Sequence, residues 1–290
     1  MTAGLLIDGK LVAVPGVTVI PPASHGGPSW CRLGVDDYAA RKVAPSIIVI
    51  HTTGGRWGQP VRAGAGKPGH AQQILEMWAG ADHRGGEHEH SGAPIVVDYD
   101  GTVYCASDIV RTAAHHAQRI NQRSIGIEMC TYPDGGITEA TLDATAAITA
   151  ALTHSGAPGS GLLAIPAQMP RGPYRGQPLR RLELGGVQTD GRGLVGVIGH
   201  RDSTGRRGRG DPGDAIWQRL AALGFDGVDY DGGEDVELGR VRQSALNARD
   251  AKAGNTFRPL VVDGVCGYLS LLSMERQGFR RWSDVQVMPA

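Results

Sequence analysis

Residues 46–53 read SIIVIHTT, a continuous apolar run that ends in a histidine and two threonines. Such a run is typical of a strand that is buried on both faces of a sheet. A second run of this kind, LVGVIGH at 194–200, also ends in a histidine, and RSIGIEM at 123–129 predicts a further short strand. Strands this apolar need other elements to cover them, so these stretches decide the fold class.

The remaining segments alternate irregularly between predicted strands and helices. PIVVDYDGTVY at 94–104 predicts two strands joined at Asp100 and Gly101. Apolar residues recur with helical spacing in three further segments, at 70–80, 137–156 and 212–224. The simplest architecture is an α/β fold with a central mixed β-sheet flanked by helices.

Composition shifts divide the 290 residues into four predicted parts. These are an N-terminal appendage at 1–40, a main domain at 41–226, an acidic glycine-rich linker at 227–235 and a small helical module at 236–290. The module is too short to bury much apolar surface alone, so we expect an accessory role. Within the main domain, residues 157–192 are rich in Gly, Pro and Arg and predict an irregular surface segment near the site.

The charge balance and the cysteines exclude several classes of protein. Lys plus Arg and Asp plus Glu both total 29, so no net field attracts polyanions. The arginine-rich stretch GHRDSTGRRGRGDPG at 199–213 is therefore not predicted to bind nucleic acid. The four cysteines form no CxxC pair, which argues against a zinc knuckle or a dense disulfide framework. No apolar run is long enough to predict a membrane span.

Three residues suggest a metal centre. His51 and His200 each end an apolar strand, where the sheet fixes the backbone and the side chain can face a cleft, and Asp211 follows eleven residues after His200. Three protein ligands with one open position are typical of a catalytic rather than a structural zinc site. Taken singly, each histidine could also be an ordinary strand-end residue bonded to a loop.

Glu128 is a candidate general base. Strand alternation in SIGIEM places Ser124, Gly126 and Glu128 on one face. Small neighbours beside a carboxylate would leave room for a substrate, and the carboxylate could accept a proton from the water that a metal activates. The alternative is a surface glutamate on an edge strand.

A competing metal site lies in DHRGGEHEH at 82–90, which concentrates three histidines and two glutamates. A glycine-containing loop could bind a metal ion adventitiously. It lacks the rigid backing that a catalytic site needs, so we interpret this stretch as a solvated loop.

Four stretches together resemble the zinc-dependent N-acetylmuramoyl-L-alanine amidases of the type 2 amidase and peptidoglycan recognition protein family. They occur in the family's order and span about residues 45–218: IIVIHTT, VVDYDGTVY, AAHHAQRINQRSIGIEM, and GHRD followed by GDPG. The resemblance implies an α/β fold with a mixed sheet and one zinc ion held by His51, His200 and Asp211. It also implies hydrolysis of the amide bond between N-acetylmuramic acid and L-alanine in bacterial peptidoglycan.

The resemblance also implies roles for four other residues. Glu128 matches the family's catalytic glutamate, and Arg209 stands where members commonly carry a lysine that donates to the developing oxyanion. The arginine keeps the charge and the donors but not the shape of a lysine. His116 and Asn121 are expected near the substrate, although core packing is an equal alternative for His116.

Other expectations concern partners and location. The rival function is a non-catalytic peptidoglycan recognition protein, but relatives of that kind typically lose a zinc ligand, and all three positions are filled here. The partner is then bacterial peptidoglycan, bound by a monomer, and residues 259–278 more weakly resemble small peptidoglycan-binding modules, the alternative being a helical lid. The N-terminal residues lack the basic region of a signal peptide. We therefore expect holin-type release, as for a phage endolysin, or specialised secretion of an antibacterial effector, and otherwise a cytoplasmic enzyme.

Overall fold

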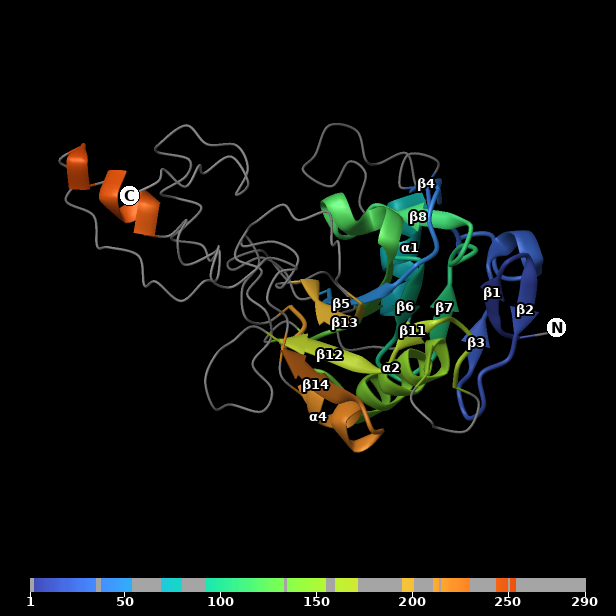
Figure 1. Cartoon of the computed structure of the whole chain (residues 1–290). Helices are drawn as coiled ribbons and strands as arrows, with labels where there is room; N and C mark the ends of the chain where they lie inside the picture. Colours follow the sequence, from blue (N-terminus) through green and yellow to red (C-terminus); the bar gives the residue numbers. More distant parts are fainter. Residues whose placement is uncertain are drawn as a thin grey trace.

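Figure 1 shows a computed structural model of the chain. It describes residues 3–34, 38–53, 69–79, 92–132, 135–154, 160–171, 195–200, 211–213, 215–229, 244–249 and 251–253. Within these ranges, no helix combines the length and the apolar character that crossing a membrane would require.

A six-stranded mixed sheet forms the centre of the molecule (Figure 1), in the order β13-β5-β9-β6-β7-β3. The first four strands in this order run parallel, β7 is antiparallel to β6, and β3 is parallel to β7. The predicted α/β fold with a mixed sheet is therefore confirmed. The strands are β3 (Val19–Ile20), β5 (Ile47–Thr52), β6 (Ile95–Val97), β7 (Val103–Cys105), β9 (Ser124–Met129) and β13 (Gly196–Gly199).

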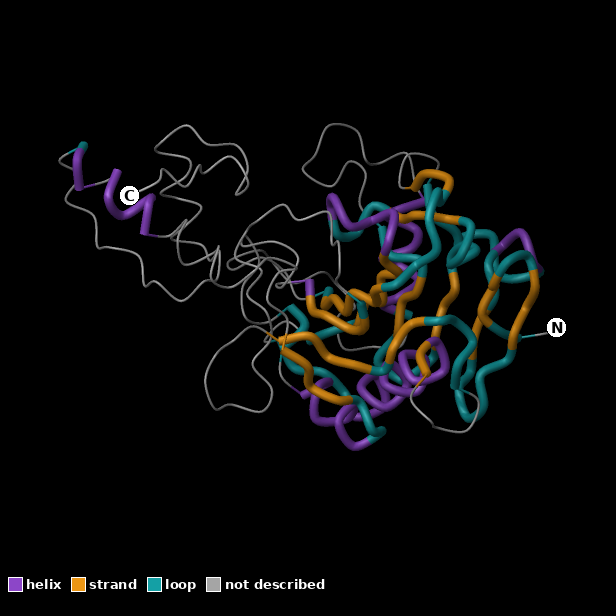
Figure 2. Tube along the Cα trace, viewed as in Figure 1, coloured by secondary structure: helices purple, strands orange, loops and turns teal. Residues whose placement is uncertain are grey.

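Both faces of the sheet are covered, because its central strands are apolar on both sides. Ile48 and Ile50 of β5 belong to the core that includes helices α2 (Glu139–Leu152) and α4 (Ala215–Ala222). Ile47 and Val49 point the other way and pack with residues in and beside the 3-10 helix η3 (Gln118–Arg123). Helix α1 (His70–Ala79) lies on the side of the sheet opposite α2 and α4 (Figure 2). The side chains of the candidate site lie on the face of the sheet to which Ile47 and Val49 point.

Helix α2 is shorter than the sequence predicts. Thr138 caps it, since its Oγ1 accepts a hydrogen bond from the Thr141 N–H at 3.0 Å. It ends at Leu152 rather than near residue 156, because the next residues form β10 (Thr153–His154), which pairs with β11 (Ile165–Pro166). Helix α4 likewise starts at Ala215, three residues after the start of the segment at 212–224 that the sequence predicts to be helical.

The N-terminal residues differ from the predicted appendage. They begin with a hairpin: β1 (Leu5–Ile7) and β2 (Lys10–Val12) pair across Asp8 and Gly9, both in the left-handed region. However, β3 adds an edge strand to the main sheet, and the segment contributes apolar side chains to the main core, namely Leu5, Leu6, Val14 and Val19. Burial of these side chains ties the segment to the domain. A second small sheet joins β4 (Tyr38–Ala40) to β8 (Thr112–Ala114).

The predicted irregular segment at 157–192 contains regular structure where the structure describes it. Besides β11, it holds β12 (Gln168–Arg171), which pairs in parallel with β14 (Asp226–Asp229) just after α4. The histidine-rich stretch at 82–90 lies outside the described residues. So does most of the predicted module at 236–290, in which residues 244–249 are helical.

Candidate functional site

The candidate site lies where three neighbouring parallel strands end. His51 on β5 and Glu128 on β9 are register partners, and Gly199 of β13 pairs with Ile50, so His200 follows one position beyond. Adjacent partners in a parallel sheet point to the same face. The apolar run that buries each strand thus delivers one polar side chain to a common edge.

Three side chains at this edge present metal-binding atoms to one another. They belong to His51, His200 and Asp211, and their ligand atoms all lie within 4.8 Å of one another. The two imidazole rings are 4.3 Å apart between centroids, and His200 Nδ1 lies 2.9 Å from Asp211 Oδ2. Both histidines are buried, with exposed fractions of 3% and 7%. The structure therefore brings together the three residues that the sequence proposed as ligands.

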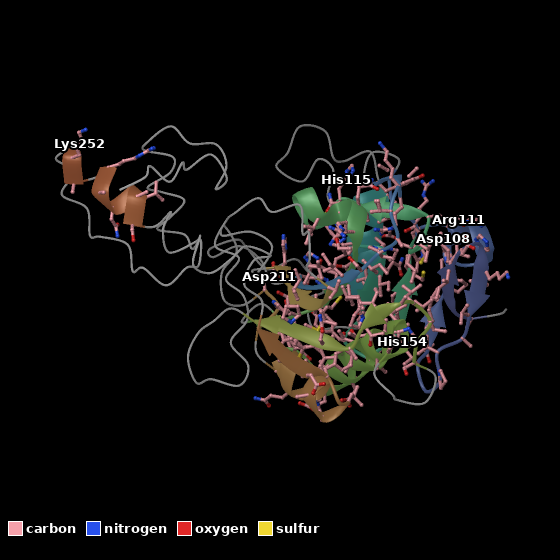
Figure 3. All side chains as sticks on the ribbon, viewed as in Figure 1. Asp108, Arg111, His115, His154, Asp211 and Lys252 are labelled. Carbon is pink, nitrogen blue, oxygen red and sulfur yellow. The ribbon has the colours of Figure 1, made fainter. Side chains whose placement is uncertain are left out.

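Asp211 is held by one residue that is far from it in the sequence, and a local hydrogen bond follows it in the chain. Its Oδ1 accepts a hydrogen bond from the Thr52 N–H at 3.0 Å, and Trp217 of α4 donates its indole N–H to the Gly213 carbonyl at 2.7 Å. Asp211 accordingly lies at the β5 and β13 end of the sheet (Figure 3). One carboxylate oxygen is fixed by the backbone and the other faces His200.

The strand alternation that the sequence predicts for β9 is confirmed. Ile125, Ile127 and Met129 pack in the core on the α2 side, so Ser124, Gly126 and Glu128 point to the opposite face. Glu128 is half-buried between β5 and β6, where its register partners are His51 and Val96. β9 is a central strand, so the alternative of an edge-strand glutamate does not hold.

One inference from this alternation is wrong. The sequence predicts that Gly126 leaves room for a substrate beside Glu128, but a protein side chain fills the space. A Cβ on Gly126 would lie 2.7 Å from Cγ and 2.8 Å from Nδ1 of His116. The absence of a side chain at Gly126 therefore makes room for the imidazole ring of His116, a residue between β8 and η3 in the chain.

His116 is hydrogen-bonded through both ring nitrogens. Nδ1 lies 3.1 Å from Nε2 of His51, and Nε2 lies 3.1 Å from Oγ of Ser124. Burial, with a smaller contribution from charge on His200, lowers the pKa of His116 to about 3, so the ring is neutral at neutral pH. Of the two sequence interpretations, these contacts agree with packing inside the protein, directly behind a candidate metal ligand.

Asn121 supports the same region. Its Oδ1 accepts hydrogen bonds from the backbone N–H groups of His116 at 3.1 Å and Ala117 at 2.6 Å. The carboxamide oxygen thereby fixes the turn that carries His116. The expectation that His116 and Asn121 contact the substrate stays a prediction.

Sequence reasoning missed Arg41. Its guanidinium donates to five backbone carbonyls, from Ile109 and Thr112 on one side and from Asn121, Gln122 and Ser124 on the other. The closest of these distances are 2.8 Å, to Gln122 and Thr112. Burial lowers the pKa of Arg41 to about 10, which still leaves it charged at neutral pH. No local motif around this arginine signals the role, since all its partners lie at least 68 residues away.

One predicted site residue is not placed. Arg209, the candidate oxyanion donor, lies outside the described residues. Its position in the chain, two residues before Asp211, is the observation on which its role depends.

Comparisons with known proteins add the family. Solved structures that resemble the chain include PGRP-Hd from Alvinella pompejana, with 15% identity over 46% of this chain and 76% of that chain, at a TM-score of 0.34. A Se-Met AmpD derivative has 19% identity over 76% and 99% at a TM-score of 0.38. The Ph2119 endolysin from a Thermus scotoductus bacteriophage has 18% identity over 72% and 99% at a TM-score of 0.36. No curated protein matches the chain.

A family model described as N-acetylmuramoyl-L-alanine amidase matches residues 41–214. The match includes His51, Glu128, His200 and Asp211, the residues that meet at the ends of β5, β9 and β13. Because it covers more than half of the 290 residues, the chain belongs to the N-acetylmuramoyl-L-alanine amidase family.

Proposed function

We propose that this protein is a zinc-dependent hydrolase of bacterial peptidoglycan. It cuts the amide bond between the lactyl group of N-acetylmuramic acid and the L-alanine of the stem peptide. The observation that carries the proposal is the convergence of His51, His200 and Asp211 beside Glu128, within a chain of the amidase family.

The three convergent residues fit a zinc ion by their chemistry. Two imidazole nitrogens and one carboxylate oxygen are a donor set that zinc prefers, with bonds of about 2.0–2.2 Å. Ligands of one tetrahedral ion are then about 3.3–3.6 Å apart, which is compatible with donor atoms that all lie within 4.8 Å. When bound, zinc would supply polarisation of the scissile carbonyl and a water molecule of lowered pKa.

Glu128 is the proposed proton carrier. Its carboxylate points to the same face as His51, one strand away, and is half-buried. From there it accepts a proton from the attacking water and returns it to the alanine nitrogen as the amide bond breaks. General base catalysis of this kind typically contributes about 10²- to 10⁴-fold in rate.

Arg209 is the proposed oxyanion donor. Its guanidinium carries charge and several N–H groups, which can stabilise the negative oxygen that develops on the scissile carbonyl. Replacement by alanine should lower kcat by about 10²- to 10³-fold, and replacement by lysine should retain most of the activity.

The test is hydrolysis of purified sacculi. Wild-type protein should release free L-alanine amino termini, a chelator should abolish the release, and added zinc should restore it. Glu128→Gln should lose at least about 100-fold in rate while it binds zinc normally. Glu76→Gln, at an exposed glutamate of α1, is the matched control and should be fully active.

Two outcomes would contradict the proposal. Undiminished hydrolysis by Glu128→Gln would remove the proposed base. Wild-type protein that binds sacculi and zinc but releases no amino termini would instead favour a recognition protein. Mass spectrometry of the products from intact sacculi and from soluble muropeptides would define the preferred substrate.

A further inference from the structure

The hydrogen bonds around His116 determine where its proton lies. The hydroxyl of Ser124 donates its single proton to the carbonyl of Ile120 at 2.8 Å. Ser124 Oγ can therefore only accept from His116 Nε2, which is 3.1 Å away. The Ser124 carbonyl, which can only accept, lies 3.4 Å from the same nitrogen. Both contacts require the proton of His116 to be on Nε2.

The position of the proton on His116 also determines the position of the proton on His51. A neutral imidazole with its proton on Nε2 has an acceptor at Nδ1. His51 Nε2, which lies 3.1 Å from that Nδ1, must then be the donor. In His51 the proton is accordingly on Nε2, and the lone pair available to a metal ion is on Nδ1.

We propose that His116, backed by Ser124, is a positioning residue that selects the tautomer of His51 able to bind zinc through Nδ1. The inference rests on the proposed zinc centre. Metal-binding histidines generally donate their second ring N–H to a carboxylate, a carbonyl or water, which fixes the ring and its tautomer. Here a neutral imidazole takes the place of that acceptor.

The surroundings of His116 allow it little freedom to leave this position. Asn121 holds the backbone N–H of His116, and Arg41 donates to the Ser124 carbonyl at 2.9 Å. The ring lies against Gly126, where even a methyl group would overlap it. The Nδ1 acceptor that faces His51 is thus held in place by the backbone hydrogen bond to Asn121, by Ser124 and by the contact with Gly126 of β9.

Nuclear magnetic resonance tests the tautomers directly. Long-range ¹H–¹⁵N spectra of the metal-free wild-type protein should show both His116 and His51 protonated on Nε2. After addition of Zn²⁺, the His51 Nδ1 signal should shift while the Nε2–H is retained. A proton on Nδ1 of His116, or coordination of His51 through Nε2, would overturn the inference.

Zinc affinity, measured by chelator competition, provides a second readout. His116→Leu removes the acceptor and should weaken zinc binding by about 10- to 100-fold. His116→Asn keeps an acceptor oxygen near the Nδ1 position and should lose less than about tenfold. His25→Leu, at an exposed histidine in the 3-10 helix η1 (Ala23–His25), is the matched control and should bind zinc like the wild type. Equal affinities of His116→Leu and the wild type would contradict the inference.

The two proposals fail in different ways. Wild-type protein that binds zinc through His51 Nδ1 but leaves sacculi intact contradicts the hydrolase and supports the tautomer selection. Active, zinc-loaded wild-type protein with His51 bound through Nε2 overturns the tautomer selection and supports the hydrolase.

Discussion

The carboxylate of Asp211 accepts a hydrogen bond at 3.0 Å from the backbone N–H of Thr52, the residue that follows His51. This bond ties Asp211 to the residue beside His51, a second proposed zinc ligand that lies 160 positions earlier in the sequence. It uses Oδ1, while Oδ2 faces His200. Asp211 is therefore both a proposed zinc ligand and a hydrogen-bond acceptor within the fold, so its effects on zinc binding and on stability can be measured separately.

Asp211→Asn tests that separation. The amide oxygen can still accept from Thr52, so the unfolding free energy of the zinc-free protein should change by less than about 1 kcal/mol. Loss of the anionic ligand should weaken zinc binding by more than the roughly 10- to 100-fold typical of an outer-shell change. Asp211→Ala should also destabilise the zinc-free protein, by about 1.5–3 kcal/mol. Chelator competition measures the zinc affinity, and urea unfolding in the presence of chelator measures the stability of the zinc-free protein. Wild-type zinc affinity in Asp211→Asn would exclude Asp211 as a ligand.

Much of the site could be predicted because its signals are local. The apolar runs before His51 and His200 define buried strands, and the first polar residue after such a run is placed at the edge of the sheet by the backbone. Alternation along β9 then assigns Glu128 to the face of His51. These inferences need only the period of a strand and the burial of apolar side chains.

The supporting contacts could not be predicted, because they join distant segments. Nothing near Arg41 indicates that it meets carbonyls of β8, η3 and β9. The pairing of β3 with β7 is equally hidden, since two residues carry no periodicity to read. The sequence predicts substrate space beside Gly126, because nothing in the local pattern indicates that His116 fills that space.

Arg41 should contribute far more to stability than an exposed arginine. Arg41→Met would leave partly buried carbonyls without their donor, which costs about 1–3 kcal/mol for each unsatisfied group. We expect a loss of at least about 3 kcal/mol in unfolding free energy. Arg111→Met is the matched control: Arg111 is exposed and pairs with Asp8 at 2.8 Å, a contact typically worth about 0–1 kcal/mol. Equal losses in urea unfolding would show that the Arg41 contacts contribute little.

The buried thiols predict a loss of stability at alkaline pH. Burial raises the pKa of Cys31 and Cys105 from 9.0 to about 12, whereas the unfolded chain ionises near the ordinary value. Between these values the folded state retains protons that the unfolded state releases, so stability falls as pH rises from about 9 to about 12. The slope should be about 1.4 kcal/mol per pH unit for each thiol.

Two measurements check this prediction. Urea unfolding across this pH range should show a shallower slope for Cys31→Ala than for the wild type. Iodoacetamide at pH 8 should leave Cys31 and Cys105 unmodified until the protein is unfolded, because the native thiolate fraction is small. Rapid labelling of both residues in the native protein would contradict the raised pKa values.

Gly126→Ala should act on the metal centre through His116. The new Cβ would lie 2.7 Å from the ring and 3.1 Å from the Cβ of Ala93, so the ring must shift from the position in which it contacts His51. Overpacking of this kind typically costs about 1–3 kcal/mol in stability. We also expect zinc affinity to fall by about tenfold, since the acceptor for His51 is displaced.

A double-mutant cycle separates this mechanism from a general defect of β9. His116→Ala removes the ring that the new methyl group strikes, so Gly126→Ala should cost much less in the His116→Ala background than in the wild type. The interaction energy should therefore offset most of the cost of Gly126→Ala alone. Urea unfolding and chelator competition on the four proteins measure it, and additive losses would show that the methyl group disturbs the strand rather than the imidazole.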